Sequence, residues 1–218
     1  MRVMVVGQKW LGAALLRQCV AEGHQVVAAA APPAVGEDYD RLYATAQQLG
    51  VPVRAVRGRL AADDVPDGCE VLLAAHAHCF IDGAARARAT HGALGYHPSL
   101  LPRHRGRDAI RWALHMREPV TGGTLYRMDD GADTGPIIAQ DWCHVRPGDT
   151  PAALWRRDLA PLGLRLFSEA LARLSRGEVL AGRAQDEDLA SWEPAFSGGQ
   201  AGQGSLSLLR GRPSARRT

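Results

Sequence analysis

Short apolar runs alternate with amphipathic segments along most of the chain. Residues 2–6 form a β-branched run that predicts a strand, and residues 11–22 follow with the apolar spacing of a helix. Gly23 is placed to end that helix, and a second apolar run at residues 24–31 predicts another strand. A strand, a helix and a strand in this order imply two parallel strands.

The same alternation continues toward the C-terminus. Further strands are predicted at residues 51–56, 70–75, 93–97, 122–128 and 137–145, and further helices at residues 39–49, 83–90 and 108–116. Thr150 as N-cap and Pro151 at the first helical position begin a long amphipathic helix that is predicted to end near Ser175. The alternation predicts an α/β fold with a largely parallel sheet flanked by helices. Its ligand site is expected beyond the carboxyl ends of the strands.

The composition changes after residue 196. Residues 197–218 are poor in apolar side chains and rich in glycine, serine and arginine, so they are predicted to be a disordered tail after one folded domain at residues 1–196. Four of the 26 basic residues lie in the last nine positions, and without them 22 basic residues face 23 acidic ones. The formal charge of +3 therefore gives no support for a nucleic-acid-binding face.

Neither the cysteines nor the apolar runs indicate export or a membrane function. The four cysteines form no CxxC pair, and the apolar runs are far shorter than the ~20 residues that cross a bilayer. The chain does not begin with a basic segment followed by an apolar stretch and a small-residue cleavage site. We therefore expect a reduced, soluble, cytoplasmic protein.

One histidine stands where an α/β fold places its chemistry. His97 ends a predicted strand and precedes Pro98, which fixes the backbone, and the small polar Ser99. A histidine in such a place can move protons on a bound molecule. Residues 129–135, DDGADTG, hold three carboxylates and two glycines, and Asp133 beside His97 would favour the protonated ring and fix its tautomer. The residues alone leave structural roles open for both, as a strand-end histidine and a turn aspartate.

Two other patterns give weaker signals. Residues 7–12, GQKWLG, lack the glycine spacing of a dinucleotide site and the Walker GK[ST] of a phosphate-binding loop. A metal cluster is an alternative for the histidine-rich stretch, whose members are His76, His78, Cys79, His91 and His97. Nothing in it has the spacing of a structural zinc site, and the acidic run lacks the ordered spacing and closing glutamate of a calcium loop. No metal is expected.

Two motifs together resemble a known family. HPSLLPRHRG at residues 97–106, followed by DDGADTGPII at residues 129–138, is similar to the signature of the formyltransferase superfamily that uses 10-formyltetrahydrofolate. That superfamily includes glycinamide ribonucleotide, methionyl-tRNA and sugar-amine formyltransferases. With VGQKWLG and EGHQVV near the start, the likeness is greatest to the N-terminal hydrolase domain of 10-formyltetrahydrofolate dehydrogenases. It implies a Rossmann-like formyltransferase fold and a catalytic domain at residues 1–196.

The resemblance implies roles only for positions that match. It implies that His97 is the catalytic histidine and that Asp133 orients this histidine and a water molecule. The residues that it implies for the folate pocket are His78, Cys79, Phe80, Ile81, Asp129, Asp130, Gly131 and Ala132. It also suggests a cis peptide bond between Leu101 and Pro102, which proline allows. No metal is implied.

One position departs from the family pattern. Most transferases of the family have an asparagine two residues before the histidine, where this chain has Gly95. That asparagine donates a hydrogen bond to the formyl oxygen, and removing one such donor from other acyl-transfer enzymes costs roughly 100- to 1000-fold in rate. The hydrolase domain of the dehydrogenases also lacks it. We therefore expect a water molecule above Gly95, or protonated His97, to serve the oxygen instead.

The resemblance implies formyl transfer from 10-formyltetrahydrofolate to the amine of a small-molecule acceptor. Hydrolysis of the same donor is the alternative, and a non-catalytic folate-binding module is less favoured because His97 and Asp133 are both present. The GQKWLG loop disfavours a glycinamide ribonucleotide acceptor, because it replaces that enzyme's phosphate-binding loop. A tRNA acceptor is not expected, because residues 197–218 are too few for the additional domain of those enzymes. The oligomeric state stays open.

Overall fold

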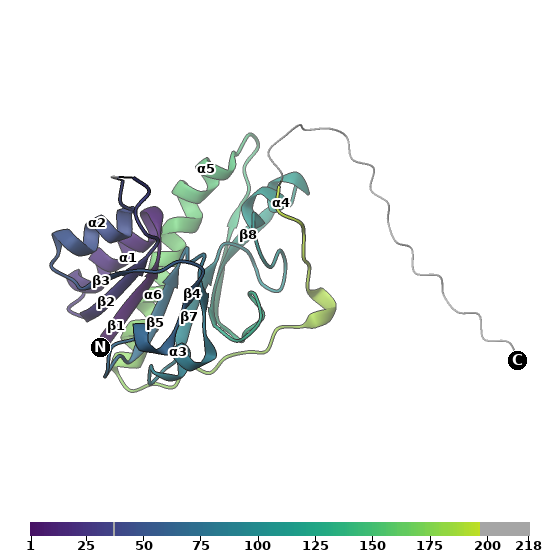
Figure 1. Cartoon of the computed structure of the whole chain (residues 1–218). Helices are drawn as coiled ribbons and strands as arrows, with labels where there is room; N and C mark the ends of the chain where they lie inside the picture. Colours follow the sequence, from purple (N-terminus) through teal and green to yellow (C-terminus); the bar gives the residue numbers. More distant parts are fainter. Residues whose placement is uncertain (37, 197–218) are drawn as a thin grey trace, which may run out of the picture.

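A seven-stranded sheet forms the centre of the molecule (Figure 1). In the computed structural model, which describes residues 1–36 and 38–196, the strand order is β3-β2-β1-β5-β7-β8-β9. The strands are β1 (Arg2–Gly7), β2 (Gln25–Ala31), β3 (Val53–Ala55), β5 (Val71–Ala75), β7 (Ala93–His97), β8 (Val120–Arg127) and β9 (Ile137–His144). The five strands from β3 to β7 in this order are parallel. Strand β8 pairs antiparallel with β7, and β9 pairs antiparallel with β8. The predicted α/β fold with a largely parallel sheet is confirmed.

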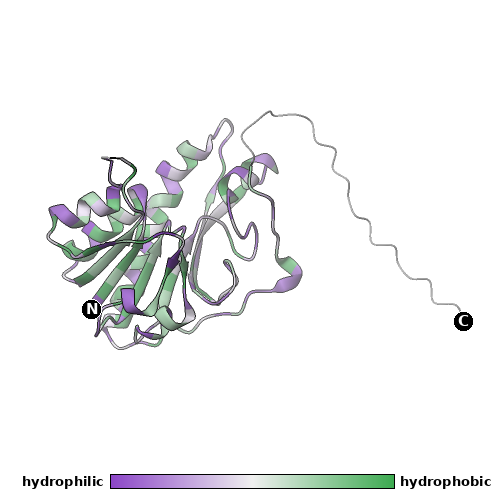
Figure 2. Cartoon of the chain, in the orientation of Figure 1, coloured by the Kyte–Doolittle hydropathy of each residue, from purple (hydrophilic) through white to green (hydrophobic). Residues whose placement is uncertain are grey.

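Helices cover both faces of this sheet. They are α1 (Lys9–Ala21), α2 (Arg41–Gln48), α3 (Gly83–Ala87), α4 (Ala109–His115), α5 (Pro151–Leu154) and α6 (Ala160–Ser175), with 3-10 turns at Ala62–Asp64 and Glu187–Leu189. The larger core lies on the face covered by α1, α2 and α6, where Phe167 and Leu15 are fully buried. The smaller core lies on the other face, against α3, and includes Met4 and Leu72. Figure 2 shows apolar residues gathered on the strands.

A second, two-stranded sheet was not predicted. It pairs β4 (Arg59–Leu60) with β6 (Phe80–Ile81) in parallel. Strands of two residues are too short to show any periodicity, so the sequence pattern could not reveal them. This small sheet sets the position of Phe80 and Ile81 next to the carboxyl end of β5.

The predicted long helix after Thr150 contains one irregular turn. The Thr150 hydroxyl accepts a hydrogen bond from the Ala153 amide at 3.2 Å, as an N-cap should. Between α5 and α6, however, Trp155–Leu159 forms a π-helical turn. Pro161 lies at the start of α6 and lacks an N–H for the bond of a regular α-helix, which explains the π-turn. The helical backbone nevertheless runs without a gap from Pro151 to Ser175, so the predicted long helix is confirmed, with a π-turn that was not predicted.

The last described segment crosses the antiparallel edge of the sheet. We call residues 180–196 the C-terminal strap, which is the yellow-green stretch of Figure 1. Arg183 and Ile137 exchange two backbone hydrogen bonds of 2.8 Å each. Further along, the Ser191 amide donates to the Pro102 carbonyl at 3.1 Å. The tail at residues 197–218, predicted to be disordered, lies outside the described residues.

Two sequence expectations concern single features of the chain. The peptide bond between Leu101 and Pro102 is cis, as expected. All four cysteines, which lie within the described residues, are free thiols. Of the helices in the described part of the chain, none has the length and apolar character needed to cross a membrane.

Candidate functional site

A cavity of about 790 Å³ opens beyond the carboxyl ends of β5 and β7. All ten residues singled out from the sequence line it: His78, Cys79, Phe80, Ile81, His97, Asp129, Asp130, Gly131, Ala132 and Asp133. The cavity size falls within the range of about 300–1,000 Å³ that is usual for small-molecule sites. The structure therefore brings together two loops that lie some 50 residues apart in the sequence.

His97 is the last residue of β7 and is 5% exposed. Alternation along the strand sends Tyr96 to the α6 side and His97 to the opposite side, toward the cavity. Nε2 of His97 lies 2.7 Å from the backbone carbonyl of His104, which can only accept, so Nε2 carries the hydrogen. Nδ1 is thereby left to face Asp133, at 3.4 Å from its Oδ2.

Asp133 is held on both of its carboxylate oxygens. Oδ2 accepts from the Gly106 amide at 2.8 Å, and Oδ1 accepts from the Tyr126 hydroxyl at 2.7 Å. The backbone of Asp133 has φ of +57°, a left-handed conformation that aspartate tolerates better than most residues. The carboxylate is consequently aimed from a turn back at His97, and its side chain is 17% exposed.

The space above Gly95 is filled by protein. A Cβ atom at Gly95 would lie 2.9 Å from Cε1 and Cζ of Tyr126 and 3.0 Å from its hydroxyl oxygen. The ring of this cross-strand neighbour therefore occupies the space directly beside Gly95. Burial, followed by the nearby Asp133 carboxylate, raises the pKa of Tyr126 well above its usual range, so the phenol stays protonated.

The acidic loop owes its shape to hydrogen bonds within itself. Oδ1 of Asp129 accepts from the Gly131 amide at 3.0 Å and from the Thr134 hydroxyl at 2.7 Å. Asp130 points outward and pairs with Arg86. Of the three carboxylates in DDGADTG, only the third therefore faces the buried histidine of β7.

The C-terminal strap ties the acidic loop to the loop that follows β7. The amide nitrogen of Gln185 donates to the carbonyls of Asp133 and Gly135, both at 2.8 Å. Its amide oxygen accepts from the Arg105 guanidinium at 2.9 and 3.1 Å. Arg105 is 3% exposed and also binds Glu187 through two contacts of 2.7 and 2.8 Å. This pairing lowers the pKa of Glu187 and raises that of Arg105.

His104 forms a second link between strap and loop. Its ring is 1% exposed and lies 3.1 Å from carboxylate oxygens of both Glu118 and Glu193. Despite these short separations, neither ring nitrogen of His104 forms a hydrogen bond within the described residues. The His104 amide donates to the Ser191 hydroxyl at 2.8 Å, and the His104 carbonyl accepts the hydrogen bond from Nε2 of His97. The strap thus supports the backbone group that fixes the tautomer of His97.

The wall formed by residues 76–81 is neutral beside two cations. The pKa of His76 is lowered to about 4, mainly by burial and to a smaller extent by Lys9 and His78. Burial also lowers the pKa of His78, with Arg107 and Lys9 adding to the effect. The Cys79 thiol has its pKa raised by burial. At neutral pH this wall therefore presents uncharged rings and a thiol, with positive charge at its edge.

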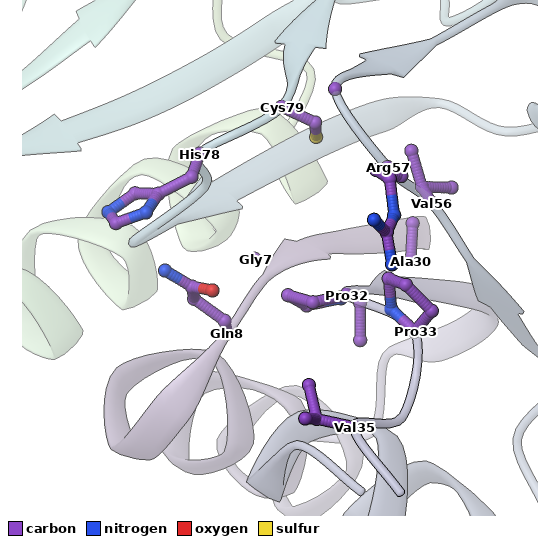
Figure 3. A pocket seen from close by; sticks show the side chains of 12 residues that line it. Gly7, Gln8, Ala30, Pro32, Pro33, Val35, Val56, Arg57, His78 and Cys79 are labelled. Atoms are coloured by element: carbon purple, nitrogen blue, oxygen red, sulfur yellow. The ribbon is translucent and has the colours of Figure 1, made fainter.

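A smaller hollow of about 280 Å³ adjoins the cavity and shares His78 and Cys79 with it. Figure 3 shows Gln8 and His78 toward one end of this hollow and Arg57 toward the other, with Pro32 and Pro33 along one side. Its lining contains no carboxylate among the described residues. This hollow suits a ligand group that is partly apolar or negatively charged.

The histidine-rich stretch does not form a metal centre in the described part of the chain. No group of three or more histidine, cysteine, aspartate or glutamate side chains lies close enough there to hold a metal ion. The rings of His76 and His78 are neighbours, with centroids 5.1 Å apart, but His76 also faces Trp155. The two rings are therefore part of an aromatic contact at the cavity edge.

Sequence reasoning missed several residues that shape the site. They are Tyr126, Gly106, Arg105 and Gln185. Alternation along residues 122–128 could have placed Tyr126 on the face of His97, had the antiparallel pairing of β7 with β8 been known. No local signal could have linked Gln185 to Asp133, because the contact joins positions 52 residues apart.

The fold and the paired loops define a class of protein. The sequence model of the formyl transferase family matches residues 1–171, and the chain belongs to that family. Cytosolic 10-formyltetrahydrofolate dehydrogenase from Xenopus tropicalis is 36% identical over 188 residues, covering 82% of this chain and 21% of the relative. The chain thus spans about a fifth of the length of these dehydrogenases.

Two further proteins are similar to the chain. Methionyl-tRNA formyltransferase from Caulobacter vibrioides is 33% identical over 199 residues, covering 86% of this chain and 64% of the relative. The crystal structure of an N-formyltransferase from Helicobacter canadensis superimposes with a TM-score of 0.71 at 16% identity, covering 88% of this chain and 70% of that one. This last likeness supports the Rossmann-like formyltransferase fold expected from the motifs.

Proposed function

We propose that the chain transfers the formyl group of 10-formyltetrahydrofolate to the amine of a small-molecule acceptor. The observation that carries the proposal is the pair of His97 and Asp133, 3.4 Å apart on the wall of the large cavity, in a chain of the formyl transferase family. Such a pair moves protons. Formyl transfer between nitrogens requires that one proton leaves the attacking amine and one reaches the nitrogen that departs.

The formyl donor is proposed to bind in the large cavity. Its ring system would lie between the wall of residues 78–81 and the acidic loop of residues 129–132, where Ile81 and Met128 offer apolar surface. The cations at the rim, Lys9 and Arg107, suit the carboxylates of a folate tail. The eight residues that the resemblance implies for the folate pocket all line this cavity, which supports the same placement.

The proposed reaction proceeds through a tetrahedral intermediate. The acceptor nitrogen attacks the formyl carbon, and a new carbon–nitrogen bond forms as the bond from that carbon to N10 of the folate breaks. His97 takes a proton from the attacking nitrogen at Nδ1 and gives one to N10. The His104 carbonyl sets the tautomer of the ring, and Asp133 orients the ring and stabilises its charged form.

Protonated His97 is proposed to stabilise the oxygen of the intermediate. Gly95 has no side chain to donate a hydrogen bond, and the space beside it is closed by Tyr126. The tyrosine hydroxyl already donates to Asp133, so it is not free to donate to a second oxygen. The Nδ1 hydrogen of the imidazolium remains as the donor to this oxygen, and one such donor has a large effect on rate.

Hydrolysis is the second candidate, favoured by a specific observation. The relatives most like the chain include 10-formyltetrahydrofolate dehydrogenases, and Gly95 with Tyr126 leaves little room beside His97. A water molecule is the smallest nucleophile that would fit there. In that reaction the water oxygen bonds to the formyl carbon as the bond from that carbon to N10 breaks, which releases formate and tetrahydrofolate with the same two proton transfers.

The acceptor class is proposed from the chemistry of related proteins. The Helicobacter canadensis structure is a complex with folinic acid and dTDP-3-aminofucose, so that N-formyltransferase binds a nucleotide sugar that carries an amine. The Caulobacter vibrioides relative is named for a tRNA acceptor. We propose a small amine for this chain, because the described residues that line the site form no broad basic face. The cytoplasm, where thiols such as the four here stay reduced, is the proposed compartment.

The test measures release of tetrahydrofolate from 10-formyltetrahydrofolate, with and without a panel of amines that includes amino sugars and initiator tRNA. We expect amine-dependent release in the wild type. His97→Ala is expected to lower the rate by about 100- to 10,000-fold, because general acid–base catalysis is lost, while folate affinity stays within about threefold. His91→Ala is the matched control, since His91 lies outside the cavity lining.

The outcomes separate the candidates. Release that does not depend on any amine would replace transfer with hydrolysis. Tight folate binding without release would leave a binding module, and an unchanged rate in His97→Ala would refute the assigned proton carrier.

A further inference from the structure

Gly95 and Tyr126 are direct partners across the antiparallel pair of β7 and β8. Directly opposed residues project to the same face of a sheet, where their Cβ atoms lie about 5 Å apart. His97 lies two residues beyond Gly95 and so shares this face. The ring of Tyr126 has tilted into the space that any side chain at position 95 would take, at 2.9 Å from its Cβ.

This tilt places the tyrosine hydroxyl against the carboxylate of the site. The hydroxyl donates to Oδ1 of Asp133 at 2.7 Å, while Oδ2 faces His97. Tyr126 is 5% exposed, and burial holds its pKa well above the ordinary value, so it remains a donor throughout the working pH range. A hydrogen bond from a neutral donor to a buried carboxylate is among the stronger ones in proteins.

The contact also settles which way the carboxylate points. Asp133 lies in a loop with left-handed backbone at its own position, and no strand ladder fixes its side chain. The Gly106 amide holds Oδ2, and the Tyr126 hydroxyl holds Oδ1. With two donors on opposite oxygens, the carboxylate plane cannot rotate, and Oδ2 stays directed at Nδ1 of His97.

We propose that Tyr126 is a positioning residue for Asp133, and that Gly95 is a glycine because only a missing side chain admits the tyrosine ring. Position 95 on β7 thus has no side chain, and the Tyr126 ring and hydroxyl from β8 occupy the space that such a side chain would fill. Tyr126 acts through Asp133 on His97 and does not itself donate to the formyl oxygen. This inference rests on the proposed function, because the pair of His97 and Asp133 is assigned there.

Tyr126→Phe keeps the ring and removes only the hydroxyl. We expect kcat to fall about 10- to 100-fold with KM within about threefold, because a hydrogen bond to a charged group is lost in the reacting state. The hydrogen bond favours the ionised carboxylate. Without it the carboxylate protonates more easily, so the acid limb of the pH–rate profile moves to higher pH.

Tyr96→Phe is the matched control. The Tyr96 hydroxyl donates to the Leu159 carbonyl at 2.6 Å and is buried on the opposite face of the sheet, on the neighbouring strand β7. Both variants lose one buried hydroxyl hydrogen bond, so similar falls in Tm are expected. Tyr96→Phe should leave kcat and the pH–rate profile unchanged. An equal change of profile in both variants would reduce Tyr126 to a packing residue and overturn the proposal.

The reciprocal side of the pair is tested at Gly95. Gly95→Ala should push the ring away, lowering both Tm and kcat, and Gly95→Asn should do so more strongly, because each Cβ lies under 3.0 Å from the ring. Adding Tyr126→Leu to Gly95→Ala removes the clash. The double variant should regain Tm and stay as slow as Tyr126→Leu alone. Recovery of kcat together with Tm would contradict a role for the hydroxyl.

The proposal and the function it rests on fail differently. Wild-type turnover that survives His97→Ala would overturn the function. A normal Tyr126→Phe rate and pH profile beside an inactive His97→Ala would overturn the inference alone. Should the wild type bind folate without turning it over, the NMR titration of the His97 ring decides. A midpoint that moves in Tyr126→Phe and not in Tyr96→Phe supports the positioning role, and unchanged midpoints overturn it.

Discussion

His97 and Asp133 meet in one cavity, but different kinds of structure bring them there. His97 is the end of a central strand, so the sheet itself sets the position of its Cα, and one carbonyl seven residues away sets its ring. Asp133 lies in a loop, and its carboxylate is placed by contacts from β8, from the loop after β7 and, through its backbone, from the C-terminal strap. The histidine is placed by secondary structure, and the aspartate by tertiary hydrogen bonds.

The difference teaches where the site is robust. A strand at the centre of a sheet loses its geometry only when the domain unfolds, whereas a loop held by a few hydrogen bonds can shift while the fold persists. Substitutions on the Asp133 side are therefore expected to change catalysis more than stability. Substitutions around His97 that disturb β7 are expected to change both.

The largest effect in this comparison is expected for Asp133→Asn. The amide keeps the volume of the side chain but loses the charge that orients and stabilises the His97 ring. By analogy with the aspartate of catalytic triads, kcat should fall roughly 1,000-fold or more, with little loss of Tm. Steady-state kinetics and thermal unfolding check this. Asp149→Asn is the control, because Asp149 binds Arg157 outside the cavity lining. A fall in kcat below tenfold would place the orienting charge elsewhere.

An intermediate effect is expected for Gln185→Leu. The substitution leaves the carbonyls of Asp133 and Gly135 without their donor and loosens Arg105. We expect kcat to fall about tenfold, since small displacements of catalytic groups are costly, and unfolding to become easier by about 1–3 kcal/mol.

Gln18→Leu provides the comparison for this strap variant. Gln18 donates to the Leu164 carbonyl at 3.0 Å between α1 and α6, away from the cavity. It should lose stability and keep kcat. If the two glutamine variants kept the same kcat, the strap would have no part in positioning Asp133.

The smallest effect concerns His76 at the cavity edge, which belongs to neither loop. In the folded chain the pKa of His76 is lowered from 6.5 to about 4, mainly by burial. Between these two pH values the ring is protonated in the unfolded chain and neutral in the folded chain. Protonation of His76 in the unfolded chain therefore lowers the free energy of unfolding as the pH falls from 6.5 to about 4. Below about 4 this free energy falls no further on account of His76.

His76→Asn should reduce the fall in unfolding free energy across this window. Asparagine is chosen because His76 has φ of +58°, which asparagine tolerates. Urea unfolding at pH 7 and at several values down to pH 4 measures the change, with His91→Asn as the control. An unchanged slope against pH would show that the ring of His76 is not shielded from water.

Much of the fold and half of the site could be predicted from local pattern. The run at residues 93–97 ends in His97 because strand alternation and the following Pro98 are both local features. The π-helical turn at Trp155–Leu159 and the two-residue strands β4 and β6 could not be predicted, since one depends on a hydrogen bond that Pro161 cannot donate and the others have no period. The contacts of Tyr126 and Gln185 with Asp133 exist only after the strands have paired and the strap has closed over them.

The C-terminal strap also has a thermodynamic consequence. It lies beyond residue 171, where the match to the family ends, yet it bonds to the acidic loop and to the loop that follows β7. A molecule that binds between the loops favours the arrangement in which the strap is closed, and by linkage a closed strap favours that molecule to the same degree. Occupancy of the cavity should therefore slow hydrogen exchange at the Ser191 and Arg105 amides, which donate to backbone carbonyls between the strap and the loop after β7.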